Sequence, residues 1–276
     1  MNSMNQALLL KQYMSNMQTN VLMADLSKVP RHWGNSGYVP DYHKFYFFLG
    51  GEGEIAINGV GYDPKPGDLM LIPSGVQQAH GTISDDTYYK YWCHFSAAVG
   101  DLSIFELIRG PILLTVHEPE RIEALFAELV RYHYKEEATA VWKVNALLLD
   151  LLYCYFEQGG MEHVPLEGSL TLDKMESVVR YMEAHLAEPV AMDDLAKIVH
   201  LHPNYFSQLF RSMLGIPPLQ YLNQLRIKKA QSLLLGTELS VTQVASEVGM
   251  ELHYFSRTFR NRVGFTPSDY RKAVRP

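Results

Sequence analysis

The 276-residue sequence is poor in cysteine and has no long apolar run. Its two cysteines, Cys93 and Cys154, form no CxxC pair and lie within apolar patterns, as is typical of buried thiols in a reducing compartment. No stretch reaches the roughly eighteen apolar residues that a membrane helix needs. The first twenty residues have neither a basic leader nor a small-residue cleavage site, so no signal peptide is expected. These absences predict a cytoplasmic protein with no membrane partner.

Common enzyme motifs are also missing. The chain contains no G-x-S-x-G, no H-E-x-x-H and no Walker loop. Residues 51–56 match G-x-G-x-x-A by letter, but they open a strand-like segment and so offer no helix N-terminus to a pyrophosphate. We therefore expect no catalytic residues, no cofactor and no enzyme activity.

Charge is distributed unevenly along the chain, whose net charge is -6. Residues 1–169 carry 11 basic and 20 acidic side chains, whereas residues 170–276 carry 13 basic and 10 acidic ones. The last twenty positions are especially basic, with Arg257, Arg260, Arg262, Arg271, Lys272 and Arg275. This asymmetry predicts that any contact with nucleic acid lies in the C-terminal third.

Residues 43–97 alternate short apolar stretches with turn residues. Asn58-Gly59, between two such stretches, is a strong two-residue hairpin signal because both turn positions tolerate positive φ. Pro66-Gly67-Asp68 predicts a second turn before the apolar run 69–72. The spacing of strands and turns predicts a small barrel or sandwich.

From about residue 103 to residue 157 the apolar period becomes helical. One predicted helical stripe consists of Ile122, Leu125, Phe126, Leu129 and Val130. Residues 144–155 form a longer, almost wholly apolar helix of the kind buried in a core or a subunit interface. The glycines and the proline that follow predict a linker. We divide the chain into a domain over residues 1–160, a linker over 161–169 and an all-helical domain over 170–276.

The all-helical domain has clear boundaries between its helices. We predict helices over residues 172–187, 192–199, 203–213, 218–235, 241–248 and 252–263, with a short one from residue 267. Thr171 and Ser240 are predicted N-caps, and prolines occupy several first turns.

Nearly the same seventeen residues occur twice in this domain, 49 positions apart. The copies are YFSQLFRSMLGIPPLQY from Tyr205 and YFSRTFRNRVGFTPSDY from Tyr254. Each unit predicts a short helix, a tight turn, a second helix with aromatics on its inner face, and then Gly-x-x-Pro. This is the layout of a helix-turn-helix, whose second helix can lie in a major groove. Stacked helical repeats are the alternative, but solenoids need about three or more copies and have no single long helix between them.

These residues resemble the DNA-binding domain of AraC/XylS-type transcriptional regulators. The resemblance rests on R-I-x-x-A-x-x-L-L over residues 226–234, and on SVTQVASEVG followed by YFSRTFRNRVGFTPSDYR in the last unit. The second turn, after Gly249, looks one residue shorter than the family's, and Met250 stands where an aromatic is common. The resemblance implies an α+β multidomain fold. Its parts are an N-terminal cupin-like effector barrel, dimerisation helices around residues 104–157, and a C-terminal domain with two helix-turn-helix units.

The outward faces of the two second helices supply the candidate DNA contacts, since their inner faces must carry the phenylalanines. Asn and Gln can bind adenine edges and Arg can bind guanine through paired hydrogen bonds. By position in the family motif, the implied base contacts are Asn204, Ser207, Gln208, His253, Ser256 and Arg257. Arginines better placed for phosphates, which fix register without reading sequence, are Arg211, Arg260 and Arg262. Arg226, on the linking helix, is expected to make an internal ion pair.

The segment GDLMLIPSGVQQAH, residues 67–80, resembles the second motif of cupin barrels. Gln78 stands where metal-binding cupins have a histidine, and His43-Lys44-Phe45 keeps only half of their His-x-His pair. A divalent transition metal needs about three or four His or carboxylate ligands in fixed geometry. We therefore expect no metal site and interpret His80 as a pocket or rim residue.

The stretch YYKYWCHF, residues 88–95, is the candidate pocket strand. Strand alternation places Lys90, Trp92 and His94 on one face, and Tyr46 and Phe48 share a face of an earlier strand. If these faces point inward, Trp92 can stack on a sugar ring while polar groups surround it. The expected effector-binding residues are Tyr46, His80, Lys90, Trp92 and His94. A plain aromatic core is the alternative.

Together these patterns predict a regulator of transcription that binds double-stranded DNA as a homodimer and responds to a small-molecule effector, a sugar or related metabolite. RNA polymerase is a further partner that such a regulator could contact. Two alternatives stay open: a cupin-type enzyme fused to a DNA-binding tail, and a regulator whose barrel is only a dimer platform. The effector, the operator and the choice between activation and repression are not determined by the sequence.

Overall fold

The computed structural model describes residues 3–100, 102–163 and 170–274. The chain forms two compact units. One, the barrel unit, spans residues 17–165; the other, the helical unit, combines residues 1–16 with residues 166–276. Residues 1–16 therefore pack with the C-terminal unit and not, as the sequence suggested, with the N-terminal domain.

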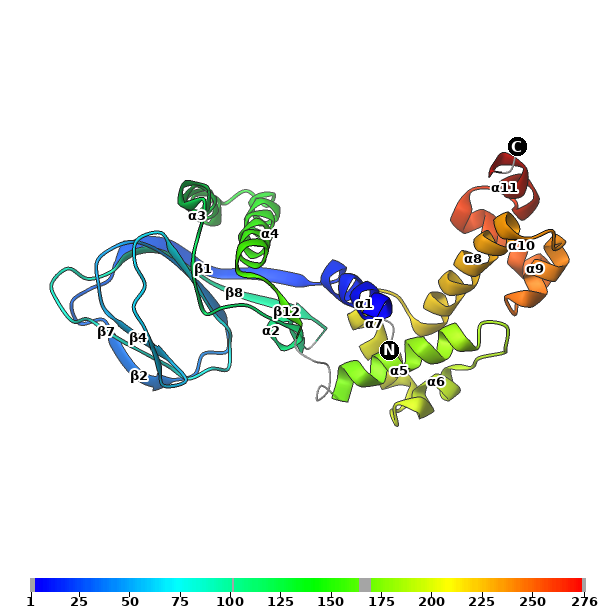
Figure 1. The fold of residues 1–276 in the computed structure, drawn as a ribbon, viewed down its shortest axis with the longest axis horizontal. Coiled ribbons are helices and arrows are strands. Elements are labelled where there is room, and N and C mark those ends of the chain that lie inside the picture. The colour runs from blue at the N-terminus through cyan, green and yellow to red at the C-terminus, as the bar shows by residue number, and fades with distance from the viewer. Residues whose placement is uncertain (1–2, 101, 164–169, 275–276) are drawn as a thin grey trace. The chain divides into compact units, whose positions relative to one another are not determined.

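The barrel unit contains two main antiparallel sheets (Figure 1). The larger has the order β1-β8-β3-β6-β11, with β9 beside β8. Its strands are β1 (Gln18–Lys28), β3 (His43–Gly50), β6 (Asp68–Ile72), β8 (Tyr89–Val99), β9 (Leu102–Ser103) and β11 (Leu113–Thr115). The smaller has the order β2-β7-β4-β5, formed by β2 (Gly34–Tyr38), β4 (Glu54–Ile57), β5 (Val60–Tyr62) and β7 (Gln78–Gly81). The predicted hairpin joins β4 to β5, with φ of 50° at Asn58 and 81° at Gly59.

The space between the two sheets is filled by one apolar cluster. The larger sheet contributes Tyr46, Phe48 and Met70, and the smaller contributes Ile55 and Ile57. Tyr46 and Phe48 therefore share the inner face of β3, as the pocket predicted from the sequence requires. Trp92 packs against the same cluster as a partly buried residue, which places the even-numbered face of β8 on the inside.

Two helices cover the opposite face of the larger sheet, α3 (Pro119–His133) and α4 (Ala140–Gly159) (Figure 1). Phe126 of α3 stacks on Phe47 and Tyr91, with ring centroids 6.1 and 5.7 Å apart, and Tyr155 of α4 meets Phe45 edge-on. The buried residues of α3 are Ile122, Phe126 and Leu129, which belong to the predicted stripe.

The segment before α3 is less helical than expected. Only α2 (Ile104–Leu107) is helical there, and the chain then forms β10 (Ile108–Arg109) and β11. The predicted linker is also partly structured, because β12 (Glu162–His163) pairs with β10. Residues 164–169 of that linker lie outside the described residues.

The helical unit follows the predicted boundaries closely. Its C-terminal helices are α5 (Leu170–Ala184), α6 (Met192–Ile198), α7 (Pro203–Leu214), α8 (Pro218–Gly236), α9 (Val241–Glu247), α10 (Leu252–Val263) and α11 (Pro267–Val274). Ser240 caps α9 through a capping box with Gln243, as its position predicted. Thr171 is not a cap, because it lies inside α5.

The described residues include no helix that is long and apolar enough to cross a membrane. Both cysteines, Cys93 and Cys154, are buried and free, which confirms their interpretation as core thiols.

His43, on the helix-facing side of β3, makes the barrel unit sensitive to acid. The backbone N–H of Ser74 donates to its Nδ1 at 2.8 Å, so this nitrogen must be unprotonated in the fold. Burial lowers the pKa of His43 to about 4. The unfolded chain takes up the proton near its ordinary pKa of about 6.5, so stability is complete above that pH and is lost as the pH falls toward 4.

We expect His43 to cost the barrel unit roughly 2 kcal/mol of unfolding free energy between pH 6.5 and pH 5. All three tryptophans, Trp33, Trp92 and Trp142, lie in the barrel unit, so urea unfolding followed by tryptophan fluorescence reports on it alone. In the variant His43→Asn, whose amide oxygen can still accept from Ser74, the loss should shrink by that amount. An equal loss in variant and parent would contradict this assignment.

Candidate DNA interface and effector pocket

The two predicted helix-turn-helix units have the same turn geometry. The first joins α6 to α7 and the second joins α9 to α10. The N–H of Leu201 donates to the carbonyl of Ala196 at 3.1 Å, and the N–H of Met250, 49 residues later, donates to that of Ala245 at 2.9 Å. The second turn is therefore as long as the first. Met250 is buried in the core of the second unit.

The helices α7 and α10 also end alike. Gly215 and Gly264 have φ of 80° and 85°, a left-handed conformation that favours glycine. The phenylalanine pairs Phe206–Phe210 and Phe255–Phe259 lie on the inner faces, with ring centroids 5.7 and 5.6 Å apart. All four phenylalanines are fully buried, which confirms the expectation that they form the core.

The opposite faces of α7 and α10 carry the predicted DNA contacts. Asn204, Gln208 and Arg211 of α7 are exposed, and Ser207 between them is half-buried. The corresponding residues of α10 repeat this pattern: His253, Arg257 and Arg260 are exposed, and Ser256 is half-buried. Arg262 is exposed near the end of α10. Each unit thus presents one row of polar side chains on a rigid helix.

Arg226 of α8 forms no ion pair with any residue that the structure describes, contrary to expectation. Its guanidinium donates instead to two backbone carbonyls, those of Leu186 at 2.9 Å and Glu188 at 2.6 Å. These carbonyls follow the end of α5, where unpaired backbone acceptors are usual. Arg226 therefore holds the end of α5 against α8 as a structural residue.

The helical unit contains one element that the sequence did not assign to it, α1 (Ser3–Ser15). Leu9 and Tyr13 of α1 are buried, and the hydroxyl of Tyr221 on α8 donates to Oε1 of Gln12 at 3.0 Å. Asn16 lies against Gly215, the residue that ends α7. The N-terminal helix is thus packed on the first helix-turn-helix unit.

The barrel unit contains a pocket of about 220 Å³ at the inner face of β8. Four of the five predicted effector residues line it, namely Tyr46, Lys90, Trp92 and His94. His80 does not line it but stacks on Trp33, which does, with ring centroids 4.1 Å apart. The remaining lining residues are Ser27, Val29, Pro30 and Trp33. The indole N–H of Trp92 donates to the Ser27 hydroxyl at 3.0 Å, which fixes the orientation of the ring.

Two buried lysines dominate the electrostatics of this interior. Lys90 Nζ lies 3.7 Å from the ring centre of Tyr46, and Lys44 Nζ lies 2.7 Å from Oε1 of Gln78. The Lys44 ammonium also donates to the Tyr38 hydroxyl. Burial lowers the pKa of Lys90 to about 7, with a further contribution from Lys44, and lowers that of Lys44 to about 8.

The imidazoles of His80 and His94 are held neutral. Burial, followed by the charges of Lys44 and Lys90, lowers the pKa of each to about 4. At neutral pH the two rings therefore contribute hydrogen-bonding nitrogens and aromatic surface but no charge. Among the residues that the structure describes, no group of three His, Cys, Asp or Glu side chains is placed to hold a metal ion.

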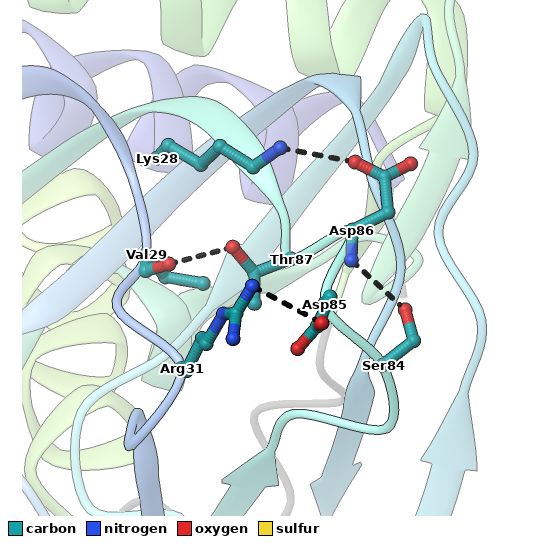
Figure 2. Close-up of polar contacts among 7 residues, drawn as sticks. All are labelled: Lys28, Val29, Arg31, Ser84, Asp85, Asp86 and Thr87. Carbon is teal, nitrogen blue, oxygen red and sulfur yellow. Dashed lines mark hydrogen bonds and ion pairs between the residues drawn. The ribbon is translucent and has the colours of Figure 1, made fainter.

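The wall of the pocket formed by residues 28–31 is fastened to the loop before β8 (Figure 2). Lys28 and Arg31 form ion pairs with Asp86 and Asp85 at 3.0 and 3.1 Å. All four of these side chains are at least half exposed, so the pairs contribute little stability. The buried bond from the Thr87 hydroxyl to the carbonyl of Val29, 2.6 Å long, is the stronger attachment.

Sequence reasoning missed several residues of this interior. Trp33 lies before β2, in a segment without a strand pattern, and Lys44 was considered only as the middle of an incomplete metal motif. Gln78 occupies the place of a cupin metal ligand and is instead the partner of Lys44. The alternation of Lys44 with Tyr46 along one strand was a usable signal, because it puts both on the same face.

Family models match both units. The AraC-like ligand-binding domain matches residues 32–152, and a helix-turn-helix domain matches residues 195–273. The first match covers the two main sheets except β1, all of α3, most of α4 and five of the eight residues that line the pocket. The second covers most of α6 through α11.

Similar proteins include regulators of similar length. The Msm operon regulatory protein of Streptococcus mutans is 23% identical over 229 residues, 80% of this chain and 81% of that protein. The arabinose operon regulatory protein of Salmonella typhimurium is 27% identical over 236 residues, 80% of this chain and 78% of that protein. The DNA-binding domain of AdpA, solved with a target DNA, is 33% identical over 37% of this chain and 93% of that one, with a TM-score of 0.36.

A ligand-binding barrel joined to a pair of helix-turn-helix units defines the class as a DNA-binding transcriptional regulator. More narrowly, the chain belongs to the AraC family. The family expected from the repeated segment is thereby confirmed, as is the α+β fold with an N-terminal sheet domain and a C-terminal helical domain.

Proposed function

We propose that this regulator reads two adjacent major-groove segments of double-stranded DNA, one with α7 and one with α10, under the control of a small metabolite bound in the barrel. The observation that carries the proposal is the duplication of an exposed polar row on two helices that share a glycine C-cap and a buried phenylalanine pair. A single recognition surface would not require the second copy.

The linking helix α8 supports this arrangement by its length. Its 19 residues, at 1.5 Å per residue, span about 28 Å. One turn of B-DNA is about 34 Å, so two recognition helices separated by such a spacer can reach the same side of a duplex. In this assignment the base contacts come from Asn204, Ser207, Gln208, His253, Ser256 and Arg257, and the phosphate contacts from Arg211, Arg260 and Arg262.

Base contacts and phosphate contacts have different signatures. The test uses a DNA duplex chosen by in vitro selection for binding to the parent protein. Gln208→Ala and Arg257→Ala should each cost about 1–3 kcal/mol of binding free energy to this duplex and relax the base preference at one position. Arg211→Met and Arg260→Met should weaken binding to all sequences alike and reduce the salt slope by about one. Fluorescence anisotropy across a salt series measures both quantities.

Arg180→Met serves as the matched control, because Arg180 is an exposed arginine on α5, outside both recognition helices. It should leave affinity and salt slope unchanged. If Gln208→Ala and Arg257→Ala leave base preference intact, then α7 and α10 do not read sequence as proposed.

The barrel pocket is the proposed effector site. Its volume is about 220 Å³, whereas sites for drug-sized ligands measure about 300–1,000 Å³. The smaller volume favours a metabolite the size of a single sugar. Trp92, fixed by Ser27, offers a flat apolar face, and Tyr46, Lys90 and His94 offer polar groups around it. A barrel that only supports dimerisation would not require polar groups in its interior.

We propose α4 as the contact between two subunits. Its inner face packs on the sheet, but Trp142, Leu149 and Tyr153 on its outer face are 73%, 43% and 58% exposed. These positions are seven and four residues apart, so they lie on one side of the helix. A homodimer formed across this face would bring two pairs of recognition helices to one operator.

Leu149→Glu places a charge in this face and should weaken dimerisation at least tenfold. Light scattering over a dilution series measures the effect, and tryptophan fluorescence checks that the barrel stays folded. Ala127→Glu, an added carboxylate on an exposed position of the neighbouring helix α3, is the control and should leave the dimer intact. Equal dimerisation of both variants and the parent would rule out the outer face of α4.

We propose that α1 transmits the effector signal. It packs on the first helix-turn-helix unit through Leu9 and Tyr13. In sequence it ends two residues before β1, the strand that carries Ser27 of the pocket. Effector binding at β1 can therefore change how strongly α1 holds the helical unit, as a shift between two populations.

Releasing α1 should mimic the signal. Among the described side chains of α1, that of Tyr13 is the most deeply buried, and Tyr13→Ala removes it. Lys11→Ala alters an exposed side chain of the same helix. We expect Tyr13→Ala to raise operator affinity at least threefold without effector and to abolish the response to effector, with Lys11→Ala behaving as the parent. An unchanged effector response in Tyr13→Ala would remove α1 from the mechanism.

A further inference from the structure

Two lysines are buried in the barrel interior beside Tyr46; Lys90 lines the pocket, and Lys44 lies behind its lining. Lys44 on β3 is 1% exposed and Lys90 on β8 is 3% exposed. Their Nζ atoms lie 5.9 and 3.7 Å from the ring centre of Tyr46, so both charges adjoin one side chain. Lysines are almost never buried this completely unless they are paired.

Neither ammonium has a carboxylate partner among the described residues. Lys44 contacts the Tyr38 hydroxyl and the Gln78 amide oxygen, and Lys90 lies over the rings of Tyr46 and Trp33. The Tyr46 ring is the closer of these two, at 3.7 Å against 5.5 Å for Trp33. Oxygen dipoles and ring faces compensate only part of the desolvation of two neighbouring positive charges.

The carboxylates on the same side of the sheet are engaged elsewhere. Asp25, which β1 places opposite Trp92, accepts the backbone N–H of Leu26 at 2.8 Å and forms no ion pair with either lysine. Asp68 at the start of β6 accepts the Thr115 hydroxyl at 2.6 Å and the backbone N–H of Lys65 at 2.8 Å. The described interior therefore carries positive charge without a matching negative one.

One further donor in this interior has no partner among the described residues. The side chain of Gln78 is 2% exposed, and its Nε2 makes no hydrogen bond. Because an ammonium can only donate, the oxygen of this amide must face Lys44, which leaves the N–H groups on the other side. A buried donor without an acceptor costs about 1–3 kcal/mol, so its persistence favours a missing acceptor.

We propose that the effector is an anion, a sugar acid whose carboxylate is bound by Lys90 in the positive field of Lys44 while its ring lies against Trp92. The proposal rests on the proposed function of the pocket and specifies the chemical class of its ligand. A carboxylate supplies the counterion that Lys90 lacks, and its charge offsets the mutual repulsion that helps to lower the pKa of Lys90. A neutral sugar would leave both lysines without a counterion.

The test compares ligands that differ only in the group on the last carbon. Calorimetry and thermal unfolding of the full chain are measured with D-glucuronate and D-galacturonate, with D-glucose and D-galactose, and with the two hexose 6-phosphates. We expect at least one uronate to bind at least ten times more tightly than its neutral hexose and to raise the unfolding midpoint.

Lys90→Met keeps the length of the side chain and removes its charge. It should weaken uronate binding at least tenfold, yet the unliganded variant should unfold at the same or a higher temperature, because a buried unpaired charge is gone. Lys65→Met, which removes an exposed lysine of the same unit, should bind as the parent does. A fold that is lost in Lys90→Met is detected by tryptophan fluorescence, and Lys44→Met then provides the second variant.

The outcomes separate this inference from the proposed function. If neutral hexoses bind as tightly as the uronates, the effector is not an anion, but a small-molecule effector remains possible. If only the 6-phosphates bind, the pocket recognises a phosphate and the proposed carboxylate ligand is wrong. If none of the six ligands binds while selective DNA binding persists, the sugar acid is overturned and the regulator stands. Absence of selective DNA binding overturns the proposed function itself.

Discussion

The alternation of side chains along β3 and β8 is the constraint on which the barrel unit depends. Successive residues of a strand point to opposite faces, so one strand must serve two environments at once. Phe45 and Phe47 pack on α3 and α4, whereas Lys44, Tyr46 and Phe48 line the interior. The helices provide an apolar layer outside the sheet, and this allows the inner face to be partly polar. The pocket with its buried Lys90 lies beside the apolar cluster between the sheets, and α3 and α4 add a second apolar layer on the other side.

In the helical unit, one packing solution is used twice. Each helix-turn-helix buries a phenylalanine pair and closes its second helix with a left-handed glycine, and α8 packs on both units. Its residue Arg226 also holds the end of α5 through two backbone carbonyls. The rigidity of these contacts leaves the outer faces free to carry polar side chains, which suits readout of DNA because recognition requires preset positions.

Much of this architecture was predictable from local patterns. The paired glycines, the phenylalanine spacing and the Asn58-Gly59 hairpin are signals whose physical cause lies within a few residues. Helix boundaries in the helical unit followed for the same reason. The predictions failed where a partner distant in sequence decides the structure: Arg226 binds carbonyls forty residues away, and β12 pairs with β10 across two helices.

The sequence by itself determined the family, the two helix-turn-helix units and the face of β8 that carries Lys90, Trp92 and His94, because periodicity and spacing are local properties. Only the tertiary structure decided that Trp33 joins this face, that Gln78 pairs with Lys44, and that α1 belongs to the helical unit. Each of these depends on contacts between segments far apart in the chain, and the charge balance of the pocket can be judged only once every neighbour of a buried ammonium is known.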